Sequence, residues 1–175
     1  KTFTAAASVV AGKTLDGDGT VAITALDATA AADLSKITAA SVTAAVADDV
    51  TFTGTIGKAV VSVDATKTFT STAAKVNGET LNGAGTVAIT ALDATADADL
   101  SNITASSVTA NVANDVTFTG IIGSTVVSVH SGTTFTTTAA KVNGDTLNGA
   151  GIVAIIALDA TADTDLSSNT ASSIT

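Results

Sequence analysis

The stretch Val87-Ala-Ile-Thr-Ala-Leu-Asp-Ala-Thr-Ala96 repeats residues 21–30 without a single change. The opening Lys1-Thr-Phe-Thr4 likewise returns at 67–70 and, with Thr in place of Lys, at 133–136. Each return comes 66 residues after the previous one, so the 175-residue chain holds two full copies, 1–66 and 67–132, and a partial third, 133–175. Because self-similarity at a fixed period is the signature of repeat architectures, we expect one repetitive β array over residues 1–175.

Composition and local pattern both favour β-structure. The chain is 46% hydrophobic but only 3% aromatic, and its five aromatic residues are all Phe. Val, Ile and Thr are strand formers, whereas Thr, Asp and Gly interrupt the Ala-rich stretches and disfavour long helices. The second copy divides into four pieces, each of which opens with a short strand-like run: 67–83, 84–98, 99–114 and 115–132.

Two folds fit these pieces. In the first, the chain is a narrow parallel β-solenoid of about 16–17 residues per coil, with four coils in each 66-residue repeat and apolar residues stacked inside. In the second, each copy is a small β-sandwich and the copies follow one another like beads. We favour the solenoid, because a single copy is short for a sandwich without disulfides or large aromatic side chains.

Comparison of the copies separates core positions from turns and surface. Six apolar columns persist and are predicted core positions: Phe3/Phe69/Phe135, Leu15/Leu81/Leu147, Val21/Val87/Val153, Ile23/Ile89/Ile155, Leu26/Leu92/Leu158 and Leu34/Leu100/Leu166. Three Gly columns also persist, and we expect them at turns with positive φ: Gly12/Gly78/Gly144, Gly17/Gly83/Gly149 and Gly19/Gly85/Gly151. By contrast, Lys13 becomes Glu79 and then Asp145, which indicates a solvated position.

Charge and composition exclude several functions. The net charge is −9 and the chain has seven Lys and no Arg, so it lacks the positive footprint that nucleic-acid binding requires. No apolar run is long enough to span a membrane. Without Cys, a disulfide framework and a thiolate metal site are both excluded. Because no acid–base constellation persists through the copies, we expect no enzyme, no catalytic residue and no cofactor.

Acidic clusters offer two candidate calcium sites, since calcium prefers several converging carboxylate and carbonyl oxygens. The stretch Asp16-Gly-Asp-Gly19 resembles a calcium loop, but both of its acids are lost in the later copies. A second group persists better, and its candidate ligands are Asp93, Asp97, Asp99, Asp159, Asp163 and Asp165. We favour the alternative that these Asp side chains hold turns by accepting hydrogen bonds from nearby backbone N–H groups.

Three further features are candidate sites. His130 is the only His, its counterpart in the first copy is Asp64, and we expect it to be exposed. Asn102-Ile-Thr104 matches a glycosylation acceptor, which chance explains well. Thr-x-Thr units occur at 51–55, 68–70, 117–119 and 134–138. On a flat β face such ranks could bind ice, although Phe residues interrupt them in the sequence.

Three segments carry a resemblance to a known family: Asp-Leu-Ser-Asn-Ile-Thr at 99–104, Asp-Val-Thr-Phe-Thr-Gly at 115–120 and Leu-Asn-Gly-Ala-Gly-Thr-Val-Ala-Ile-Thr at 81–90. They resemble the β-strand repeats of very large bacterial surface and secreted proteins, including adhesin-like and haemolysin-like repeat proteins of aquatic bacteria. The resemblance implies an extracellular, elongated, β-rich array, and it carries over no catalytic or binding residue.

The function that we expect is therefore structural. The chain is predicted to be a segment of an extracellular or cell-surface bacterial fibre, filament or adhesin stalk. Its partners would be neighbouring copies of the same protein or the rest of a longer chain. The alternative is an ice- or carbohydrate-binding solenoid that uses exposed Thr, Asn and Asp. The absence of Trp and Tyr argues against the carbohydrate version, because no aromatic stacking platform is available.

Overall fold

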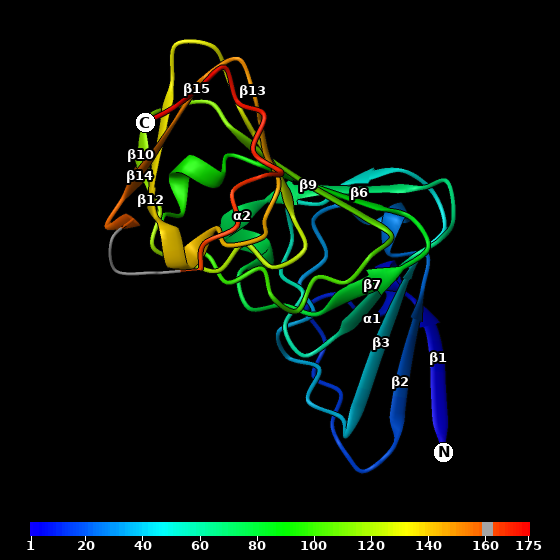
Figure 1. Cartoon of the computed structure of the whole chain (residues 1–175). Coiled ribbons are helices and arrows are strands. Elements are labelled where there is room, and N and C mark those ends of the chain that lie inside the picture. The colour runs from blue at the N-terminus through cyan, green and yellow to red at the C-terminus, as the bar shows by residue number, and fades with distance from the viewer. Residues whose placement is uncertain (159–162) are drawn as a thin grey trace.

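The computed structural model describes residues 1–158 and 163–175, and Figure 1 shows the course of the chain. The strands are β1 (Thr2–Ala6), β2 (Thr20–Thr24), β3 (Ser41–Val46), β4 (Val50–Thr51), β5 (Val60–Val63), β6 (Thr68–Thr72), β7 (Leu81–Gly83), β8 (Thr86–Thr90), β9 (Ser107–Val112), β10 (Val116–Thr117), β11 (Val126–Val129), β12 (Thr134–Thr138), β13 (Leu147–Gly149), β14 (Ile152–Ile156) and β15 (Ser173–Ile174). The helices are single turns: α1 (Ala7–Val10), η1 (Leu26–Ala28), α2 (Ala73–Val76), η2 (Leu92–Ala94) and η3 (Ala139–Lys141).

The described strands form three sheets, and every pair within them is parallel. Their orders are β1-β2-β3-β5-β7, β4-β6-β8-β9-β11-β13 and β10-β12-β14-β15. A β-sandwich needs antiparallel pairs, so the alternative of tandem sandwiches does not describe this chain. The mostly β, all-parallel arrangement is that of a β-solenoid-like fold.

The chain passes alternately through two columns of stacked segments. The first column contains, in order, β1, β2, β3, β5, β7, the turn segment 98–104, the segment 116–121 (which includes β10), β12, β14 and β15. The second column contains, in order, the segments 12–15, 33–38 and 50–55 (the last of which includes β4), β6, β8, β9, β11, β13 and the segment 165–170. Each coil thus contributes one segment to each column.

Backbone hydrogen bonds join the irregular segments to the strands above and below them. In the first column, Leu81 of β7 pairs with Ile103, and the amide of Phe118 donates to the carbonyl of Thr136 in β12 over 2.7 Å. In the second column, the amide of Phe52 donates in the same way to Thr70 of β6, also over 2.7 Å. The two columns therefore continue where the named sheets end.

The coils are on average longer than predicted. The number of residues between stacked partners matches the predicted coil length for Thr43 and Val60. For Leu15 and Ile37 it is clearly larger. The pairs Thr2–Thr20 and Thr20–Ser41 lie between these extremes. The prediction fails because it assigned a coil to each short run, whereas the corners between strands hold extra turns. The 3₁₀ helices η1 and η2 occupy two of these corners.

The prediction of four coils per copy is also wrong. Copy 1 supplies seven segments, namely β1, 12–15, β2, 33–38, β3, 50–55 and β5. Copy 2 supplies seven, namely β6, β7, β8, 98–104, β9, 116–121 and β11. Seven segments make three and a half coils, so equivalent strands of consecutive copies fall in opposite columns. Phe3 in β1, Phe69 in β6 and Phe135 in β12 accordingly lie in three different sheets.

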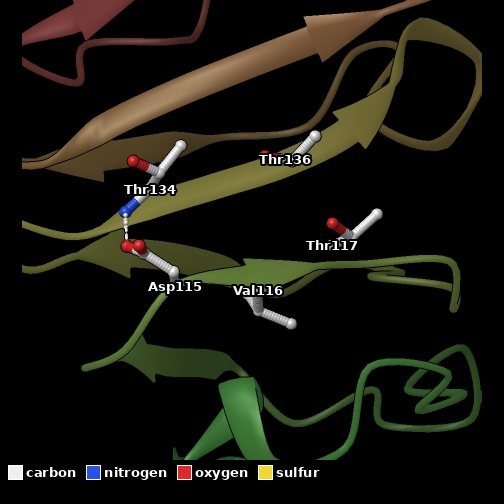
Figure 2. A pocket seen from close by; sticks show the side chains of 5 residues that line it. All are labelled: Asp115, Val116, Thr117, Thr134 and Thr136. Atoms are coloured by element: carbon white, nitrogen blue, oxygen red, sulfur yellow. Dashed lines mark hydrogen bonds between the residues drawn. The ribbon is translucent and has the colours of Figure 1, made fainter.

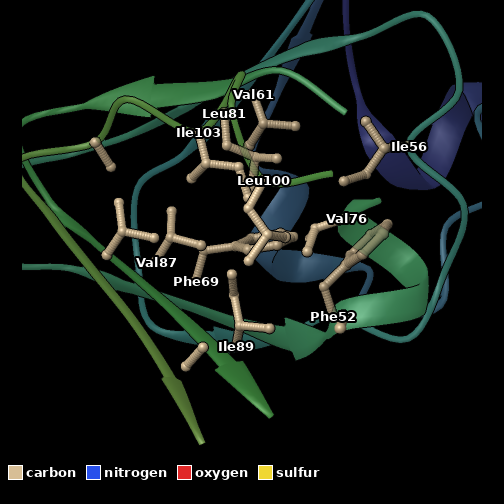
Figure 3. Packing of buried hydrophobic residues seen from close by; sticks show 14 of the residues in the cluster. Phe52, Ile56, Val61, Phe69, Val76, Leu81, Val87, Ile89, Leu100 and Ile103 are labelled. Carbon is tan, nitrogen blue, oxygen red and sulfur yellow. The ribbon is translucent and has the colours of Figure 1, made fainter. Parts of the chain in front are cut away.

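The core lies between the two columns and forms one continuous cluster of buried side chains. In Figure 3, side chains from the first column, such as Leu81, face Phe69 and its neighbours from the second. Phe rings stack between coils, with centroids 5.4 Å apart for Phe52–Phe69 and 5.5 Å for Phe118–Phe135. Such burial of apolar surface is the main source of stability in a fold of this kind.

The predicted core columns are confirmed in the second copy, where all six side chains are at most 1% exposed. Some positions in the outer copies differ. Phe3 is 49% exposed and Leu158 is 52% exposed, while Leu15, Ile155 and Leu166 are only half-buried. The reason is positional for Phe3: β1 has a stacked neighbour only on its β2 side.

Two of the three predicted Gly columns adopt positive φ, with 73° at Gly78 and 111° at Gly83 in the second copy. The third column, which contains Gly85, does not. Here glycine is needed for space, because a Cβ on Gly85 would lie 2.7 Å from the carbonyl oxygen of Lys67. The expectation of positive φ is therefore wrong at this column.

Candidate functional site

The outer surface of the second column carries rows of small polar side chains. One row, fixed by the strand register, runs Thr51, Thr70, Ala88, Thr109 and Val126. The Phe residues that interrupt the Thr-x-Thr units in the sequence point into the core, since Phe52 and Phe69 are at most 1% exposed. The outward Thr row is thus broken by Ala88 and Val126, not by Phe as the sequence suggested.

A shallow, open depression lies on the outer surface of the first column, between β10 and β12. It is lined by Asp115, Val116, Thr117, Thr134 and Thr136. Figure 2 shows the Thr117 and Thr136 side chains on one side of the strands and Val116 directed away from them. The amide of Thr134 donates a 2.7 Å hydrogen bond to Asp115 Oδ1. The depression therefore offers one carboxylate and three hydroxyl groups, which can accept and donate hydrogen bonds.

The same arrangement recurs one copy earlier on the second column. The amide of Thr68 donates a 2.8 Å hydrogen bond to Asp49 Oδ1, and Thr51 pairs with Thr70 as Thr117 pairs with Thr136. The sequence indicated that the arrangement occurs twice, because residues 49–54 and 115–120 are identical. What it did not indicate is the 19-residue register that places Asp49 beside Thr68.

The calcium candidates that lie in the described part of the chain are not gathered into a site. Within the described residues, no group of three His, Cys, Asp or Glu side chains is placed to hold a metal ion. Asp97 and Asp163 are exposed, Asp93, Asp99 and Asp165 hold backbone amides, and Asp159 lies outside the described residues. Asp16 and Asp18 are exposed as well.

Asp99 and Asp165 take the turn role that the sequence favoured, since each accepts a hydrogen bond from the amide two residues on. Asp99 Oδ1 accepts from Ser101 Oγ at 2.6 Å and from the Ser101 amide at 3.0 Å, and these bonds lower the pKa of Asp99. Asp93 reaches farther, to the next coil. Its partial burial acts to raise its pKa, but hydrogen bonds from the Asn114 side chain and the Ala113 amide outweigh this and lower it.

Glu79 has a pKa above its usual value, because burial disfavours its charged form. A carboxyl whose folded-state pKa is raised costs stability above that pKa, and the cost disappears once the pH falls below the unfolded value. We therefore expect Glu79→Gln to raise the free energy of unfolding at pH 7 and to have little effect near pH 3. The gain should stay below about 1 kcal/mol, since the side chain is only half-buried and solvent screens its charge. Urea denaturation at the two pH values measures this.

The matched control is Lys13→Gln at the equivalent position of the first copy, where the side chain is exposed. Because this side chain is exposed to solvent, the control should change the free energy of unfolding by less than about 0.5 kcal/mol at both pH values. An equal gain in the free energy of unfolding at pH 3 and pH 7 for Glu79→Gln would contradict burial of the Glu79 charge as its cause. The half-burial of Glu79 and Asp145 also corrects the prediction that this position is solvated in all copies.

The remaining single candidates lie on the surface. His130 is exposed, as predicted, and its imidazole makes a small contribution to the lowered pKa of Asp93. Asn102 is also exposed, at the turn of segment 98–104. A membrane-spanning helix is absent from residues 1–158 and 163–175. No protein-family model, curated protein or solved structure matches the chain.

Proposed function

We propose that this chain is a structural segment of an extracellular bacterial fibre, filament or adhesin stalk. The observation that supports this most is strand pairing across the copies. β4 and β5 of the first copy pair with β6 and β7 of the second, and β10 and β11 of the second pair with β12 and β13 of the third. The copies thus share sheets and a core, without a hinge between them.

A rod of this kind lengthens by adding copies, because each copy stacks on the copy before it and is covered by the copy after it. Along its axis the partners are further copies, either in the same longer chain or in a neighbouring molecule. A net charge of −9 and an outer surface rich in Thr suit a solvated stalk. The location outside the cell rests on the resemblance to surface repeat proteins.

Arrays of two, three and four complete copies test this proposal. Three and a half coils at about 4.8 Å each make about 17 Å per copy, so the maximum dimension from small-angle X-ray scattering should grow linearly by that amount. Growth with the square root of copy number would be the behaviour of flexibly linked beads, and it would contradict a stalk.

A binding module is the second candidate, favoured by the outward Thr rows and the depression beside Asp115. The row through Thr51 and Thr70 would have to order water if the ligand is ice. Thermal hysteresis in a solution of the purified chain tests this version, and its absence removes it. The carbohydrate version would instead use the carboxylates and hydroxyls of the two equivalent surfaces.

A further inference from the structure

The two equivalent surfaces described above share their residues and their central hydrogen bond. We call them the Asp49 surface (Asp49, Thr51, Thr68 and Thr70) and the Asp115 surface (Asp115, Thr117, Thr134 and Thr136). In each, an Asp Oδ1 accepts from the amide of the Thr 19 residues on, over 2.8 and 2.7 Å respectively. In each surface the Asp and the first Thr are exposed, and the two Thr residues of the stacked strand are half-buried.

The two surfaces lie on opposite sides of the core. The Asp49 surface belongs to β4 and β6 in the second column, and the Asp115 surface belongs to β10 and β12 in the first. Between them lie the buried rings of Phe52, Phe69, Phe118 and Phe135, each at most 1% exposed. This opposition follows from the odd number of segments per copy, so it would recur in every further copy.

We propose that the array is two-sided: consecutive copies present the same polar surface to opposite sides, so that one chain bridges two layers of a hydroxyl-rich polymer such as a polysaccharide. A whole number of coils per copy would instead place all equivalent surfaces on one side, which suits a chain lying flat on a single layer. The polymer class follows from the surface chemistry, because a carboxylate and several hydroxyls pair well with sugar hydroxyl groups. This partner rests on the carbohydrate version of the second candidate function.

The two-sided geometry is testable without any natural ligand, because the chain contains no Cys of its own. Thr51→Cys combined with Thr117→Cys places a biotin on each surface after labelling with a short-linker biotin-maleimide. The matched control combines Thr51→Cys with Thr109→Cys, which lie in one column three strands apart, or about 14 Å. All three Thr side chains are exposed.

Native mass spectrometry with excess monovalent streptavidin gives the readout. We expect two streptavidins on the Thr51/Thr117 variant, because the core separates its two labels. We expect one on the Thr51/Thr109 variant, because two bulky proteins collide when their attachment points lie so close on one face. A single streptavidin on the Thr51/Thr117 variant, as on the control, would mean that its two labels share one face, and it would overturn the two-sided arrangement.

The polymer partner is tested separately with dextran particles. The unmodified chain should cross-link them into aggregates, whereas a chain carrying a bulky polyethylene glycol on Thr51→Cys or on Thr117→Cys alone should bind particles and leave them dispersed. Binding without cross-linking by the unmodified chain would overturn bridging. A complete lack of binding would overturn the polymer partner and the carbohydrate function together, while the streptavidin count still decides the geometry.

Discussion

Phe69→Ala is expected to lower the free energy of unfolding by about 3–5 kcal/mol. Phe69 is fully buried at the centre of the array, and its ring lies 5.4 Å from that of Phe52 in the neighbouring coil. Truncation removes both the apolar surface and the ring contact, and it leaves a cavity that two stacked coils cannot close. Since domains of this size are stable by only about 5–15 kcal/mol, the loss is a large share of the total.

The copies supply a matched control in Phe3→Ala, at the equivalent position of the first coil, where the ring is 49% exposed. This variant should lose less than half as much. Urea denaturation followed by circular dichroism gives both values. Equal losses for the two variants would show that Phe69 does not lie in a coil covered on both sides.

Gly120→Ala is expected to destabilise the chain by about 1–3 kcal/mol or more. A Cβ at this position would collide with the carbonyl oxygen of Ala98 in the stacked coil, and the ring of Phe118 would lie 2.7 Å from it on another side. Backbone on one side and a buried ring on the other leave no direction in which the methyl group can move. The coils would have to separate locally, which breaks the amide contact between Gly120 and Ala96.

Gly78→Ala separates this steric effect from backbone strain. Gly78 has a φ of 73°, but a Cβ there would meet no atom within 4 Å. Its cost should therefore be only that of a left-handed alanine, about 1 kcal/mol. Melting temperatures of the two variants at equal concentration provide the comparison, and a larger loss for Gly78→Ala would refute the close coil-to-coil approach at Gly120.

The repeat and the inward-facing residues could be predicted from the sequence, because apolar identity at columns such as Val21/Val87/Val153 persists through the copies. Coil length could not, because the corners carry no regular apolar pattern. Ala91 illustrates this: it adopts a left-handed φ of 53° just before η2, although its type favours other conformations and gives no turn signal. Because the corners were placed wrongly, the sequence predicted four coils per copy instead of three and a half.

The candidate site was predictable only in its parts. The identical segments 49–54 and 115–120 and the Thr-x-Thr units were visible in the sequence. Their juxtaposition depends on the 19-residue register between β4 and β6, which long-range backbone pairing decides. Three Asp residues, by contrast, were predictable as turn formers, since Asp33, Asp99 and Asp165 each bond the amide two residues on.

Seven segments per copy place equivalent residues in opposite columns. The most direct test of this arrangement is the electron–electron distance between spin labels on Thr43→Cys and Thr109→Cys. These equivalent, exposed positions lie in β3 of the first column and β9 of the second. We predict a separation on the order of 30 Å, from about 17 Å along the axis, about 10 Å between the columns and the outward reach of both labels. A separation of about 19 Å, as four whole coils in a single column would give, would contradict the placement of β3 and β9 in opposite columns.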